Sequence, residues 1–131
     1  MKHPGLINEF KYTDSSNFEW SDNNFNKIKK IINKYPQGKQ QSAILPVLDI
    51  AQRQNKGWLS KQAIEKVAET LSISFIRVME IATFYSMFNL EPIGKYFIQM
   101  CRTTPCWLRG SDKLITIAKE ITGCEIGETS E

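Results

Sequence analysis

Hydrophobic runs of membrane-spanning length are absent from this sequence. Its most apolar stretch, residues 81–90, is interrupted by Thr83, Ser86 and Asn89, whereas a transmembrane helix needs about 20 mostly apolar residues. The first ten residues lack the apolar centre of a secretory signal. They are also neither rich in arginine nor free of acidic residues, as a mitochondrial presequence would be. We therefore expect an intracellular protein that reaches a membrane only through its partners.

The sequence also has little net charge and few histidines and cysteines. The 17 Lys and Arg residues against 14 Asp and Glu leave a net charge of +3, far from the dense basic face of a nucleic-acid-binding protein. The cysteines number three, and an odd number in a reducing compartment argues against a disulfide framework. These thiols are left with thiolate chemistry or simple burial as their roles.

What the chain does contain is typical of a globular protein. Its 131 residues, 41% hydrophobic and 24% charged, suffice for one domain with a buried core, or for one domain and part of another. Residues 1–20 show no sustained period and predict an irregular segment. Residues 21–91 predict a helical bundle, and residues 92–131 predict a strand, a loop and a helix. The predicted fold class is therefore α/β.

Four helical patterns occupy the bundle region. The third is the most regular, because Ile64, Val67, Ala68 and Leu71 form one apolar stripe. Serine or aspartate precedes these patterns, where a side-chain oxygen can accept hydrogen bonds from the free N–H groups of a first turn. The predicted helices run from Ser21 or Asp22 to Tyr35, from Ser42 to Gln54 with Pro46 in the first turn, from the cap Ser60 to Leu71, and from Ser74 to Phe88.

The fourth predicted helix is apolar on nearly every side. Arg77 and Glu80 are its only charged residues. A helix of this kind must be covered on nearly every side. The other three helices can cover one face, so we expect a second layer or a partner to cover the other.

A single strand is predicted after the bundle. The segment Tyr96–Met100 is apolar on both faces apart from one glutamine, which is typical of a strand inside a parallel sheet. A turn containing Pro105 follows, and then a helix from Ser111 or Asp112 to Gly123. One strand cannot form a sheet, because its backbone groups need neighbouring strands. We expect the other strands to follow residue 131 or to come from another chain.

Cys101 and Cys106 stand on either side of this turn and are the candidate metal ligands. Their Cys-x4-Cys spacing is not the Cys-x-x-Cys of a thiol–disulfide oxidoreductase. It is close to the spacings of structural zinc sites and matches one class of [2Fe–2S] ferredoxin. Spacing alone leaves a buried structural pair and a metal site equally open. The neighbouring Arg102 and Arg109, with the hydroxyls of two threonines, favour thiolates and so a metal site.

The ligand count is incomplete for a cluster. A [2Fe–2S] cluster needs four protein ligands, and the sequence offers Cys101, Cys106 and Cys124. Cys124 follows a helix-ending glycine, which favours a packed or surface residue. His3, the one histidine, lies near the terminus and is a poor ligand candidate. A small zinc site formed by Cys101 and Cys106, with or without Cys124, stays open as an alternative.

Several segments together carry a family resemblance. The sequence resembles the small thioredoxin-like [2Fe–2S] subunit of respiratory NADH:quinone oxidoreductase, complex I, from about residue 18 to the last residue. The segments that carry the resemblance are Ser42–Gln54, Val78–Phe88, Pro92–Cys101, Arg102–Asp112 and Gly127–Thr129.

The resemblance implies a helical bundle packed on a thioredoxin-like domain. It also implies a binuclear cluster held by two pairs of cysteines, in which Cys101 and Cys106 are the first pair. The second pair, Cys-x3-Cys, is expected past Glu131, so the chain is expected to be a C-terminally truncated form of a longer subunit. Cys124 matches no ligand position of the family.

The function implied is one-electron transfer between a flavin and the cluster, in an oxidoreductase and translocase of the respiratory chain. The implied partners are the subunit that binds FMN and NADH and the large iron–sulfur subunit. The chain alone is not expected to be catalytic. In a bacterium it is expected in the cytoplasm, peripheral on the inner face of the inner membrane, and in an organelle on the matrix side. The alternatives are a cluster-less interaction fragment and the equivalent subunit of an NAD-linked formate dehydrogenase or hydrogenase.

Overall fold

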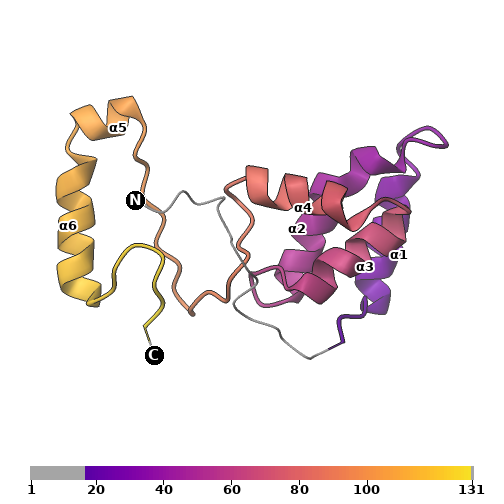
Figure 1. The fold of residues 1–131 in the computed structure, drawn as a ribbon, viewed down its shortest axis with the longest axis horizontal. Helices are drawn as coiled ribbons and strands as arrows, with labels where there is room; N and C mark the ends of the chain where they lie inside the picture. The colour runs from indigo at the N-terminus through magenta and orange to yellow at the C-terminus, as the bar shows by residue number, and fades with distance from the viewer. Residues whose placement is uncertain (1–16, 131) are drawn as a thin grey trace. The chain divides into compact units, whose positions relative to one another are not determined.

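The computed structural model of the chain describes residues 17–130 (Figure 1). The chain divides into two compact units, residues 1–92 and residues 93–131. Most of the irregular segment predicted over residues 1–20, together with His3, lies outside the described residues.

The first unit is a helical bundle, and the four predicted helices are confirmed. They are α1 (Asp22–Ile32), α2 (Ile44–Gln54), α3 (Lys61–Leu71) and α4 (Phe75–Phe84), with a short 3-10 turn, Gln40–Ala43, leading into α2. Figure 1 shows these helices packed together in one group. Ser21, Ser60 and Ser74 each accept a hydrogen bond from the backbone N–H three residues on, as Ncap residues do.

The core of the bundle lies around α2 and α3. The apolar stripe predicted for the third helix is confirmed, since Ile64, Val67, Ala68 and Leu71 are all buried. Leu48 of α2 and Val78 of α4 are also fully buried. Burying a large aliphatic side chain contributes roughly 1.5–3 kcal/mol to folding. These buried side chains therefore form the core that holds the helices of the bundle together.

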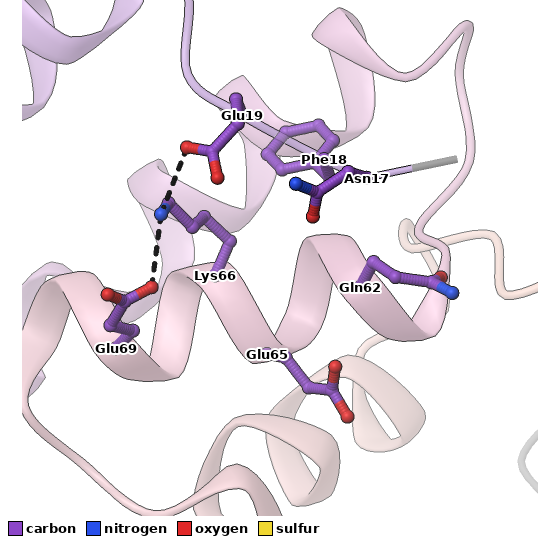
Figure 2. Close-up of a pocket in the computed structure, with 7 residues that line it drawn as sticks. All are labelled: Asn17, Phe18, Glu19, Gln62, Glu65, Lys66 and Glu69. Carbon is purple, nitrogen blue, oxygen red and sulfur yellow. Dashed lines mark ion pairs between the residues drawn. The ribbon is translucent and has the colours of Figure 1, made fainter. Parts of the chain in front are cut away.

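The residues that precede α1 are fixed to the bundle by polar contacts. Trp20 Nε1 donates a hydrogen bond to Thr70 Oγ1 at 2.8 Å, and Gln54 Nε2 donates one to the carbonyl of Glu19 at 2.6 Å. In Figure 2, Lys66 lies between Glu19 and Glu69, with ion pairs of 3.0 and 3.1 Å. Phe18 packs into the core beside them. Residues 17–20 therefore belong to the first unit.

The fourth helix is shorter than predicted. It ends at Phe84, because the backbone around residue 88 forms hydrogen bonds elsewhere in the bundle. Gln52 Nε2 donates to the carbonyl of Met87 at 3.0 Å, and Gln52 Oε1 accepts from the N–H of Asn89 at 2.8 Å. The Asn89 carbonyl in turn accepts from the N–H of Leu59 at 2.7 Å. These contacts connect residues distant in sequence, so the helical pattern could not predict them.

Only one face of α4 is covered within the first unit. Val78 and Ala82 are buried, whereas Ile76 is 65% and Phe84 79% exposed. Helices α2 and α3 pack against this face of α4, whereas α1, which the prediction included, does not. The second layer expected on its other face is not present in the described part of the first unit.

In the second unit, the predicted strand Tyr96–Met100 is wrong. Residues 17–130 contain no strand, and Tyr96, Phe97, Ile98 and Met100 are all exposed. The physical reason is the one that made a single strand doubtful: no second strand among these residues offers backbone donors and acceptors. The described residues are therefore helical without a paired strand, which is consistent with the predicted α/β class, whose sheet is incomplete in this chain.

Two helices follow in the second unit. The first, α5 (Thr104–Leu108), occupies the position predicted to be a turn. The second, α6 (Ser111–Thr122), ends at Gly123 as predicted. Its Ncap is Gly110, with a left-handed φ of 92°, in place of the predicted Ser111 or Asp112. A left-handed φ costs a glycine little, and this conformation lets the chain turn sharply between the two helices.

Candidate metal centre

The two predicted ligands lie together in the second unit. Cys101 is in the extended segment before α5, and Cys106 is the third residue of α5. No disulfide joins them, Cys101 is exposed, and Cys106 is half-buried. Their thiols are close enough that each shifts the pKa of the other through a hydrogen bond. The short helix α5 therefore places the thiol of Cys106 next to the sulfur of Cys101.

Thr103 is the nearest polar neighbour of this cysteine pair. Its Oγ1 lies 3.1 Å from Cys101 Sγ. Hydrogen bonds from the Thr103 side chain, from its backbone and from Cys106 together lower the pKa of the Cys101 thiol to about 7. The hydrogen bond to Cys101 raises the pKa of Cys106, although Thr103 opposes this in part. Cys101 is thus the first of the two thiols to ionise, and the thiolate is the form that binds metal.

We predict that the two cysteines react with iodoacetamide at different pH in the metal-free chain. Only the thiolate reacts, so the Cys101 rate should reach half its maximum at about pH 7. Cys106, whose pKa is raised, should reach half its rate at a higher pH. Trypsin separates the two at Arg102, so mass spectrometry can follow both peptides in one sample. Identical pH profiles for the two peptides would contradict this geometry.

The arginines predicted to favour the thiolates do not act on them here. Arg102 and Arg109 are exposed and form no ion pair within residues 17–130. Neither is among the causes of the Cys101 and Cys106 pKa shifts. The hydroxyl prediction holds for Thr103, whereas the Thr104 hydroxyl has no partner among the described residues. Of the four residues that the sequence suggested as partners of the thiols, Thr103 is the one that contacts Cys101.

Sequence reasoning missed α5, the element that positions Cys106. A signal for it was present. Thr103 stands at an Ncap position, and Pro105 follows within the first turn, where a missing backbone N–H costs little. Threonine followed by proline is also typical of turns, and a helix of five residues is too short to show an apolar period. The turn interpretation was therefore the natural one from sequence.

The donor set fits half of a cluster site. Nowhere in residues 17–130 do three His, Cys, Asp or Glu side chains come together to hold a metal ion. In particular, Cys124 does not join Cys101 and Cys106. Its Sγ instead lies 3.6 Å from the carbonyl of Thr122. The three-cysteine zinc site considered from the sequence is therefore not formed. Two adjacent thiols, one of them readily ionised, fit one pair of cluster ligands.

None of the helices in residues 17–130 has the length and apolar character needed to cross a bilayer.

Comparison with known proteins gives the family. The model of the thioredoxin-like [2Fe-2S] ferredoxin family matches residues 28–131. A subunit of the NADH-quinone oxidoreductase of Rickettsia conorii is 53% identical over 119 residues, which are 91% of this chain and 71% of that protein. The corresponding subunit of Rickettsia felis is 53% identical over 117 residues, 89% of this chain and 70% of that protein.

A more distant relative is eukaryotic. The mitochondrial NADH dehydrogenase [ubiquinone] flavoprotein 2 of Dictyostelium discoideum is 47% identical over 113 residues, 86% of this chain and 46% of that protein. Cys101 and Cys106 lie inside the region that the family model covers. The predicted thioredoxin-like family is thus confirmed, although residues 17–130 contain none of its sheet. The chain belongs to the thioredoxin-like [2Fe-2S] ferredoxin family.

Proposed function

We propose that this chain is the electron-transfer iron–sulfur subunit of an NADH:quinone oxidoreductase, and that Cys101 and Cys106 are the first pair of ligands of its [2Fe–2S] cluster. One observation carries the proposal. Two adjacent thiols, one with a pKa of about 7, lie in a chain that is 53% identical over 91% of its length to a subunit of an NADH-quinone oxidoreductase.

The chemistry follows from what the residues can hold. A [2Fe–2S] cluster accepts and releases one electron at a time, which suits it to exchange electrons with a flavin. Cys101 and Cys106 would bind the iron as thiolates, and their surroundings would set the reduction potential. The 131 residues contain three cysteines, so at least one of the four ligands must come from outside them. The chain therefore contributes ligands to a cluster and does not form a catalytic site of its own.

The partners proposed are the subunit that binds FMN and NADH and the large iron–sulfur subunit of the same complex. The names of the relatives support membership in such a complex. The exposed side chains of Ile76 and Phe84 on α4 are consistent with further contacts in an assembly. We further propose that the protein is peripheral, on the cytoplasmic face of the inner membrane or on the matrix side in an organelle, through the complex.

A purification tests the proposed function. The chain is expressed in its native host with an affinity tag and with its native downstream coding sequence, and the tagged protein is isolated from detergent-solubilised membranes. We expect the isolated protein to catalyse the oxidation of NADH with reduction of a quinone. NAD-linked formate or hydrogen oxidation without quinone reduction would assign it to the related dehydrogenases or hydrogenases instead. A tagged protein with neither activity would contradict the proposal.

A further inference from the structure

Thr103 occupies an Ncap position but does not use its side chain as a cap. It precedes α5 with an extended backbone, φ −67° and ψ 162°. A threonine in this position ordinarily accepts a hydrogen bond from a backbone N–H two or three residues on. The Thr103 side chain forms no such bond. Its hydroxyl is 3.1 Å from the sulfur of Cys101 instead.

The direction of this hydrogen bond is fixed once the sulfur binds a metal. Either atom of the pair can donate while Cys101 is a thiol. A sulfur that ligates iron has lost its proton and can only accept. The Thr103 hydroxyl must then be the donor, and a hydrogen bond to a charged acceptor is stronger than a neutral one.

We propose that Thr103 is a positioning residue of the iron–sulfur centre, whose hydroxyl orients the Cys101 sulfur and raises the reduction potential of the cluster. The inference rests on the proposed function and goes beyond it, because it assigns a role to a residue that is not a ligand. Reduction adds negative charge to the cluster and its sulfurs. A donated hydrogen bond therefore stabilises the reduced state more than the oxidised state, and the potential rises.

The neighbouring residue Thr104 provides a matched control. It has the same side chain, is also exposed, and its hydroxyl makes no hydrogen bond in the described part of the chain. The changes Thr103→Val and Thr104→Val remove the same chemical group from adjacent positions. Thr103→Ser keeps the hydroxyl and removes only a methyl group, so it tests for rescue.

The experiment uses the cluster-loaded protein, expressed with its native downstream sequence, and measures the reduction potential by a redox titration monitored by EPR. We expect Thr103→Val to change the equilibrium constant for one-electron reduction about tenfold, which lowers the potential by about 59 mV. The reduction potentials of Thr103→Ser and of Thr104→Val should both equal the wild-type value. A lost structural contact alone would not give this pattern.

The outcomes separate the inference from the proposed function. If the wild-type protein carries no binuclear cluster, the proposed function is wrong and the inference falls with it. If the cluster forms and Thr103→Val keeps the wild-type potential, the inference alone is wrong. Should Thr103→Val fail to load a cluster, Thr103→Ala is compared with Thr103→Ser. If the serine variant loads a cluster and the alanine variant does not, the result supports the role of the hydroxyl. Any other result overturns it.

Discussion

Replacing Cys101 with serine is expected to abolish the cluster in the protein expressed with its native downstream sequence. Cys101 is the more readily ionised of the two paired thiols, with a pKa of about 7. A serine hydroxyl stays protonated near neutral pH and is a poor ligand for iron. Even the loss of a group that only hydrogen-bonds a metal ligand costs about 10–100-fold in affinity. Cluster occupancy, measured from iron and acid-labile sulfide per chain, should therefore fall by more than about tenfold.

Cys124→Ser is the matched control for this loss. The chemical change is the same, but Cys124 lies after α6 and does not join the other two cysteines. Its thiol contacts the nearby carbonyl of Thr122 instead. We expect full cluster occupancy in this variant. Loss of the cluster in Cys124→Ser, or its retention in Cys101→Ser, would show that the ligand assignment is wrong.

The second large effect is expected in the helical bundle. Ile64 of α3 is fully buried. Ile64→Ala removes buried carbon atoms and leaves a cavity, which costs about 2–5 kcal/mol in the free energy of unfolding. A urea titration of the whole chain, followed by circular dichroism, should show a clearly lower midpoint.

Ile76→Ala makes the same change on the exposed face of α4 in the same unit, where the side chain is 65% exposed. Substitutions at such surface positions usually change stability by no more than about 0.5 kcal/mol. Its urea midpoint should match the wild type. Equal midpoints for Ile64→Ala and Ile76→Ala would contradict the core described here, and a destabilised Ile76→Ala would show that the exposed face is covered in solution.

The bundle was predictable from the sequence because its signals are local. An Ncap such as Ser60 and an apolar stripe such as Ile64 to Leu71 each lie within a few turns of one helix. The end of α4 was not predictable, since it depends on hydrogen bonds from Gln52 to Met87 and from Asn89 to Gln52, residues far apart in the chain. Local patterns thus located the helices, and long-range contacts decided where one of them stops.

The strand illustrates a different limit. Residues 96–100 are apolar enough for a buried strand, but a strand exists only in a ladder with a neighbour. No neighbour is present within residues 17–130, and the same side chains are exposed. The sequence pattern shows that this segment can form a strand, but the strand forms only where a neighbouring strand can hydrogen-bond to it.

The sequence selected the two candidate ligands of the site, whose role stays a prediction, but not the surroundings of these ligands. The spacing of Cys101 and Cys106 left a structural pair and a metal site open, and the neighbouring residues together with the family resemblance favoured the metal site. The short helix α5, which contains Cys106, has no apolar period, and the contact of Cys101 with Thr103 depends on side-chain orientation. The Thr103 and Pro105 signals for α5 fit a turn equally well, and side-chain orientation cannot be seen in the order of residues.

The central claim is that Cys101 and Cys106 form one half of a [2Fe–2S] cage. EPR of the dithionite-reduced protein tests it most directly, with the 131-residue chain compared to the chain expressed with its native downstream sequence. We predict a brown protein with a binuclear signal for the longer chain and a colourless 131-residue chain, because its three cysteines cannot supply four ligands. A colourless longer chain that contains zinc would contradict the account.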